Sequence, residues 1–189
     1  MFFILPALAI ATAAHAQNSA PVAASVEAPG RTDWQPLIAD VTAIATQQLA
    51  AALAHAYSAH IAAARPLPQP VQDFLQGIIP DEFIKRARFT VSNDTSTLPG
   101  LLNQGHRTYR NEDNAVSIDN LIIFSREPGF DTGTEARWWA HELGHHLQYQ
   151  RLGGIQGFAR QYVLNFQGLE HEAETYGEQA LKKYVQLYR

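Results

Sequence analysis

Cysteine is absent from this chain of 189 residues. Its absence excludes disulfides, thiol nucleophiles and metal sites with Cys ligands. Any bound metal ion would therefore be held by histidine and carboxylate side chains, a ligand set that suits a catalytic zinc site better than a structural one. The chain also lacks a G-x-S-x-G sequence, which argues against a serine hydrolase.

The sequence has no cluster of Lys or Arg, and its net charge is −4 with a pI near 6.0. A basic surface for nucleic acid or an anionic membrane is therefore not expected, and nucleic acid is excluded as a partner. The chain does have an ordinary globular composition, with 46% hydrophobic and 17% charged residues. This composition is sufficient for one domain with a substantial core.

The N-terminus has the features of an export signal. The apolar run from Phe2 to Ala14 is too short to span a bilayer as a helix. Ala14 and Ala16 place small residues at both positions that a signal peptidase reads, so residues 1–16 are predicted to be a signal peptide. No Lys or Arg precedes the apolar run, although signal peptides usually have one there. The alternatives to an ordinary cleaved signal are therefore a start further upstream, a weak signal or an uncleaved anchor. We expect a bacterial periplasmic or extracellular protein with no membrane span after cleavage.

Two segments precede the main domain. Residues 17–33 are rich in Ala, Ser, Pro and Gly, which predicts a flexible linker. Residues 34–65 are rich in alanine and are predicted to form a long helix. Its apolar stripe repeats every four residues, at Leu49, Leu53, Tyr57 and Ile61. The helix is either a packed scaffold or a pro-segment over the active site.

Residues 70–189 are expected to form a domain of the α+β class. The predicted elements of its first half are short helices at 71–76 and 81–87, a strand at 88–92 and two strands within 115–124. Asp119-Asn120 is suited to the tight turn between the last two strands.

Helices dominate the second half of this domain. Thr132 and Glu135 have the spacing of a capping box, and Thr134 is the alternative cap, so a helix is predicted from about Glu135 to Leu152. Gly153 and Gly154 should end it. Two further helices are predicted at 155–165 and from about Leu169 to the C-terminus.

The predicted helix 135–152 contains the sequence WWAHELGHHLQ, with His141 and His145 four residues apart. Helical side chains at this spacing lie on one face about 6 Å apart, so two imidazoles can bind one metal ion. Glu142 is rotated by about 100° from His141. From there it can accept a proton from a metal-bound water without being a ligand, as in H-E-x-x-H hydrolases. The alternative is a polar helix face with solvated histidines.

The same helix has an apolar stripe opposite the two histidines, formed by Trp139, Leu143 and Leu147. This stripe would anchor the helix in the core. Gly144 costs about 1 kcal/mol relative to Ala in a helix interior, which close approach of another group would explain. His146 lies about 100° from its preceding neighbour, and we expect it to support the site or to be structural.

Two histidines do not complete a catalytic zinc site, which usually has a third protein ligand and a water. The third histidine of metzincins is absent, because Arg151 stands six residues after His145. Glu170 and Glu174 share one face of the last predicted helix, and a nearby cation would relieve their repulsion. The alternative is a solvated acidic segment near a helix N-terminus.

His141-Glu142-x-x-His145, followed by Glu-x-x-Ala-Glu at residues 170–174, resembles the gluzincins. It is especially similar to metallopeptidases whose distal motif is Glu-x-x-Ala-Asp. The resemblance implies that Glu170 is the third ligand of one Zn²⁺ per chain, and that Glu174 supports a ligand histidine where those proteins have Asp. It also implies a minimal gluzincin core: a small antiparallel sheet over the active helix, with the ligand helix behind.

A second resemblance covers residues 83–150 and includes His-Glu-Leu-x-His-x-x-Gln, which ends at Gln148. It is to a bacterial family of uncharacterised domains regarded as zinc metallopeptidases. In such peptidases an edge strand binds the substrate as an added strand, and residues 122–125 are either that edge or an ordinary hairpin. The candidates for oxyanion stabilisation, each with packing as the alternative, are Tyr149, Tyr162 and Tyr176.

Three functions follow from these patterns. The first is an exported zinc metallopeptidase of the endopeptidase type, with a peptide or protein substrate and Glu142 as general base. The second is a non-catalytic zinc-binding scaffold, for which a retained Glu142 has no use. The third is an interaction protein in which the helix of residues 34–65 is the functional part. Neither the substrate nor the oligomeric state follows from the sequence.

Overall fold

The structure is a computed structural model that describes residues 34–92 and 115–188, and the structural statements below concern these residues. The predicted signal peptide and linker, residues 1–33, lie outside them. The described elements are α1 (Gln35–His60), a 3-10 turn (Ile61–Ala63), β1 (Arg65–Pro66), α2 (Gln69–Leu75), α3 (Asp81–Arg86), β2 (Arg88–Val91), β3 (Ala115–Ile118), β4 (Leu121–Phe124), α5 (Gly133–Arg151) and α6 (Ile155–Tyr188). The predicted α+β class is confirmed.

The four described strands form one sheet in the order β1-β2-β4-β3. β2 runs parallel to β4, and the two outer strands run antiparallel to their neighbours. The expectation of an antiparallel sheet was therefore wrong. The chain between β2 and β4, which includes β3, exceeds the roughly twelve residues that a parallel connection requires. Of the two alternatives for residues 122–125, the ordinary hairpin is the one found, because β4 lies inside the described sheet and pairs with both β2 and β3.

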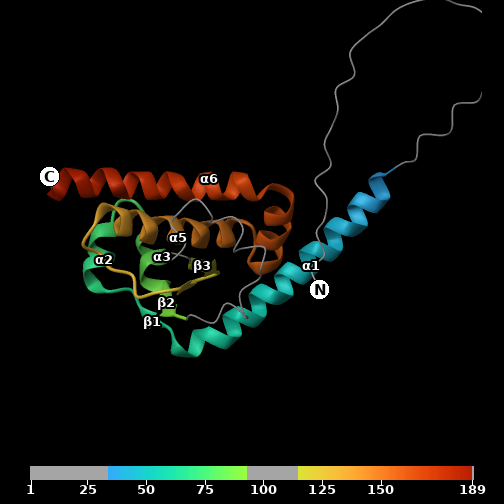
Figure 1. Cartoon of the computed structure of the whole chain (residues 1–189), viewed down its shortest axis with the longest axis horizontal. Helices are drawn as coiled ribbons and strands as arrows, with labels where there is room; N and C mark the ends of the chain where they lie inside the picture. Colours follow the sequence, from blue (N-terminus) through green and yellow to red (C-terminus); the bar gives the residue numbers. More distant parts are fainter. Residues whose placement is uncertain (1–33, 93–114, 189) are drawn as a thin grey trace, which may run out of the picture. The chain divides into compact units, whose positions relative to one another are not determined.

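Figure 1 shows α5 between α6 and the sheet. The sheet-facing side of α5 carries Trp139 and Leu143, both fully buried, which confirms these two positions of the predicted apolar stripe; the third, Leu147, is partly buried. The Trp139 ring packs edge-on against Phe89 and Phe124, with centroids 5.1 and 4.7 Å apart. The opposite face of α5 is thereby directed toward α6.

The ends of α5 follow the sequence closely. The side chain of Thr132 accepts a hydrogen bond from the Glu135 backbone N–H at 3.2 Å, which confirms the predicted cap. Gly153 and Gly154 have φ of 82° and 89°, a backbone conformation that glycine adopts without strain, and α6 begins directly after them. The two predicted C-terminal helices are both present within α6, which has a kink at Asn165 (φ −157°, ψ 59°), where the first of them was predicted to end.

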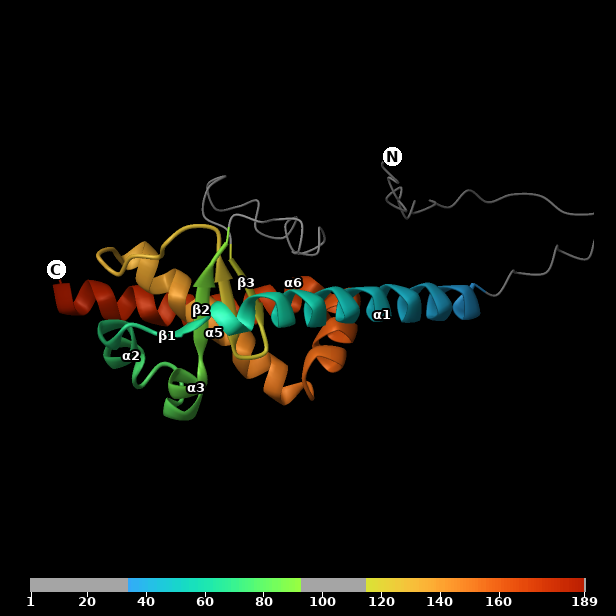
Figure 2. The same cartoon turned by 90° about the horizontal axis from the view of Figure 1, so that it is seen from below.

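Helix α1 confirms the predicted Ala-rich helix. Its C-terminal half contacts α6 and β3 and buries Leu49, Ala50, Leu53 and Ala56; Figure 2 gives the view from the α1 side. Its N-terminal half leaves several large apolar side chains more than half exposed: Leu37, Ile38, Val41 and Ile44. The segment Gln35–Ala63 has the length and composition of a membrane-spanning helix or a signal sequence.

Candidate metal centre

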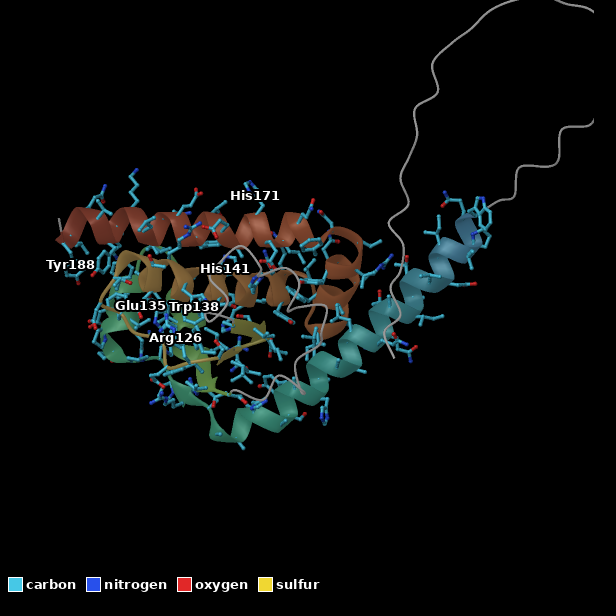
Figure 3. All side chains as sticks on the ribbon, in the orientation of Figure 1. Arg126, Glu135, Trp138, His141, His171 and Tyr188 are labelled. Carbon is cyan, nitrogen blue, oxygen red and sulfur yellow. The ribbon has the colours of Figure 1, made fainter. Side chains whose placement is uncertain are left out.

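Two histidines project from the α6-facing side of α5. The spacing of His141 and His145 places their ring centroids 5.0 Å apart. Figure 3 shows His141 between α5 and α6, whereas His171 lies on the outer side of α6. Both α5 rings are mostly buried, with side-chain exposures of 12% and 5%. The rotation of α5 that produces this arrangement is set by its apolar stripe on the sheet.

Helix α6 brings Glu170 to the two histidines. One carboxylate oxygen lies 3.4 Å from His141 Nε2, and the other lies 3.7 Å from His145 Nε2. One ligand atom from each of the three residues lies within 4.8 Å of the other two. This His/His/Glu group is the one described cluster of at least three candidate ligands, and it could hold a metal ion.

The two helices approach closely at Gly144. A Cβ on this residue would lie 3.0 Å from Ala173 Cα and 2.9 Å from Tyr176 Cδ2, both on α6. Such distances require neighbouring atoms to move. Glycine at this position therefore allows α6 to lie close enough for Glu170 to reach the histidines.

Glu174 lies beside the first histidine. One of its carboxylate oxygens is 3.3 Å from His141 Nδ1, and the other accepts from Arg137 Nε at 2.5 Å. A hydrogen bond at Nδ1 leaves Nε2 available for a metal. The Glu174 side chain is thus long enough to contact His141 and Arg137 at the same time. Sequence reasoning did not identify Arg137, although it lies four residues before His141 on one helix face.

Gln148 performs the corresponding role at the second histidine. Its side-chain oxygen lies 2.9 Å from His145 Nδ1, while its amide nitrogen donates to the Leu169 carbonyl at 2.8 Å. The amide also contacts Glu172, which is ion-paired with Arg151. This arrangement directs His145 Nε2 toward Glu170. The sequence contained the signal, because a residue three positions after a helical histidine shares its face.

Glu142 is almost fully buried, with 1% exposure. Ser117 on β3 donates a hydrogen bond to Glu142 Oε2 at 2.7 Å, and it also contacts the Glu142 backbone carbonyl. The other carboxylate oxygen, Oε1, has no hydrogen-bond partner. A buried carboxylate oxygen without a partner is unfavourable, and a metal-bound water would supply the missing partner. Ser117 was not identified from the sequence.

The charges around His141 favour a cation. Burial lowers the pKa of His141, but hydrogen bonds to Glu170 and Glu174 outweigh it and raise this pKa to about 10. Burial lowers the pKa of His145, against an opposing effect of Glu170. The site contains three carboxylates, those of Glu142, Glu170 and Glu174. Arg137 forms an ion pair with Glu174 and so compensates one of their charges. A divalent ion would balance the remaining charge.

The structure places His146 away from the cluster. Its buried ring lines a separate pocket with Tyr149, beside the turn between β3 and β4. Burial, with a smaller effect of His145, lowers the pKa of His146 to about 3, so its ring is neutral. No described hydrogen bond joins it to His141, His145 or Glu170.

The three candidate tyrosines differ in position. Tyr149 is buried beside His146, and Tyr176 packs against Gly144. Burial raises the pKa of Tyr162, and the charges of Glu170 and Glu142 raise it further.

Comparisons of this chain with protein families, with curated proteins and with solved structures found no match.

Proposed function

We propose that the chain is a gluzincin-like, zinc-dependent metallopeptidase that hydrolyses peptide bonds. One observation carries the proposal. His141, His145 and Glu170 converge from two helices beside a buried carboxylate, Glu142, which has one oxygen fixed and the other without a partner. A purely structural metal site has no need of such a group, whereas a hydrolytic site requires a base.

His141, His145 and Glu170 would hold Zn²⁺, a His/His/Glu set that catalytic zinc sites use. When bound, zinc would supply an activated water by lowering its pKa toward about 7. Glu142 Oε1 would accept a proton from the attacking water, because Ser117 holds Oε2 and fixes the carboxylate plane. The same carboxyl group then donates the proton to the leaving amine. Glu174 and Gln148 keep both histidines in the tautomer with Nε2 free.

Tyr162 is the tyrosine that this proposal assigns to the developing oxyanion. Its raised pKa keeps the phenol protonated, as a hydrogen-bond donor must be. The proposed substrate is a peptide in an extended conformation, bound beside the pair formed by Ser117 and Glu142.

The proposed site of action is the bacterial periplasm or the extracellular space. Two observations support export: the apolar N-terminal sequence and the apolar composition of Gln35–Ala63.

The test uses zinc-loaded chain, an unfolded protein substrate and mass spectrometry of the fragments. Glu142→Gln preserves size and hydrogen bonding but removes the base, so cleavage should fall by at least about 100-fold while zinc is retained. Glu178→Gln, an exposed carboxylate elsewhere on α6, is the matched control and should cleave normally. Equal cleavage by the parent and Glu142→Gln would refute the assignment of the base. Zinc binding without cleavage in the parent would favour the zinc-binding scaffold.

A further inference from the structure

A second concave feature lies on a different side of α5. It is a pocket of about 240 Å³ between α3, the turn joining β3 to β4, and the C-terminal end of α5. None of His141, His145 and Glu170 lines it. Its volume is below the roughly 300–1,000 Å³ of pockets for drug-sized ligands. A ligand of amino-acid size would fit this volume.

The inner wall of this pocket contains polar atoms without partners. His146 and Tyr149 line it and are 3% and 0% exposed. The two ring nitrogens of His146 make no hydrogen bond of normal geometry, although the Leu121 backbone lies beside the imidazole. The Tyr149 hydroxyl likewise makes none. Buried polar atoms without partners are rare in folded proteins, and a ligand or ordered water usually satisfies them.

The rim of the pocket carries one charge of each sign. Arg86 lies at the end of α3, and Asp119 lies in the turn between β3 and β4. Both charges act on Tyr57: burial and Asp119 raise its pKa, whereas Arg86 lowers it. In the described part of the chain, the two side chains do not form an ion pair with each other. The pocket therefore offers a separate cation and anion above neutral hydrogen-bonding groups.

A fixed turn holds the acidic side of the rim. Asp119 has φ 55°, a left-handed conformation that few non-glycine residues adopt but that Asp tolerates. Its neighbour Asn120 is held by two hydrogen bonds, one from Tyr57 and one to the Arg86 carbonyl. The second of these bonds ties the turn to α3, so both charged residues are attached to one hydrogen-bonded unit.

We propose that this pocket binds a small zwitterion, a free α-amino acid with an apolar side chain. Arg86 receives the carboxylate and Asp119 receives the ammonium group. Tyr149 and His146 hydrogen-bond to the polar atoms of the ligand or to water carried in with it. The partly buried ring of Phe83, on the same wall, contacts the side chain.

L-Leucine, N-acetyl-L-leucine and L-leucinamide are the probes for this site. N-acetyl-L-leucine lacks the ammonium group, and L-leucinamide lacks the carboxylate. Backbone amide shifts of Gly153 and Gly154, which line the pocket, report binding to the full chain without any need for turnover. We expect saturable shifts with L-leucine, and affinities at least about tenfold weaker with the two blocked forms. Equal binding of all three would overturn the zwitterion, and no saturable shift would overturn the site.

Two variants separate the charges. Arg86→Gln should abolish the preference for L-leucine over L-leucinamide, and Asp119→Asn should abolish the preference over N-acetyl-L-leucine. Lys182→Gln, on the far part of α6, is the control and should bind as the parent does. Tyr149→Phe tests the inner wall with a minimal change, and its melting temperature shows whether it folds. Unchanged binding in both charge variants would contradict the proposal.

Discussion

Replacement of Gly144 by alanine tests whether the close contact of α5 with α6 positions the third ligand. In an isolated helix this change should stabilise by about 1 kcal/mol. Here the new Cβ would meet the Ala173 backbone at 3.0 Å and the Tyr176 ring at 2.9 Å, so α6 must move. Overpacking of this kind costs about 1–3 kcal/mol. We therefore expect a net change between neutral and about 2 kcal/mol destabilising.

The displacement of α6 has a second, more specific consequence. Glu170 lies one turn before Ala173, so it moves with the part of the helix that is pushed away. We expect zinc affinity to fall about tenfold, measured by competition with a chromophoric chelator, alongside urea unfolding of the metal-free chain. His171→Ala, on the exposed side of α6, is the control and should bind zinc as the parent does. A more stable Gly144→Ala protein with parental zinc affinity would refute this account of the glycine.

Three further predictions concern the support of the site. Trp139→Ala should destabilise the chain by about 3–5 kcal/mol in urea unfolding, because this ring is fully buried between α5 and the sheet; a loss below about 1 kcal/mol would contradict its anchoring role. Gln148→Leu should weaken zinc binding about 10- to 100-fold in chelator competition, through loss of the His145 hydrogen bond, and unchanged affinity would contradict it. The metal-free chain should lose stability as pH rises from about 6.5 to about 10, because His141 is protonated in the folded state up to its raised pKa. Urea unfolding at several pH values in this range measures the direction of the stability change, and a stability that rises with pH would contradict the prediction.

The local elements of the domain could be predicted because each has a local cause. The Thr132 cap, the glycines at 153 and 154, and the turn at Asp119 act within a few residues of themselves. The strand order could not be predicted, because it depends on which strands meet after a long connection. β2 pairs in parallel with β4 instead of joining the hairpin as an antiparallel neighbour. The two-residue strand β1 was missed because Pro66 indicated only the end of a helix.

In the candidate site, too, the residues related by local spacing could be predicted, whereas those brought together by long-range packing could not. Helical spacing placed His141, Glu142 and His145 correctly relative to one another, since one helix contains all three. Glu170 was expected from a resemblance, and the structure brings it to the histidines. Ser117 could not be found, because it contacts Glu142 only through the packing of β3 against α5. His146 was expected to support the site or to be structural, and its buried ring lines a separate pocket with Tyr149.

Metal content tests the central claim most directly. We would equilibrate the full chain, Glu142→Gln and Glu170→Ala with a small molar excess of zinc, dialyse them and measure their zinc content by elemental analysis. We predict about one zinc per chain for the parent and for Glu142→Gln, and much less than one zinc per chain for Glu170→Ala, whose affinity is weaker. A parent chain that retains no zinc, or a Glu170→Ala chain that retains it as tightly as the parent, would contradict the proposed metal centre.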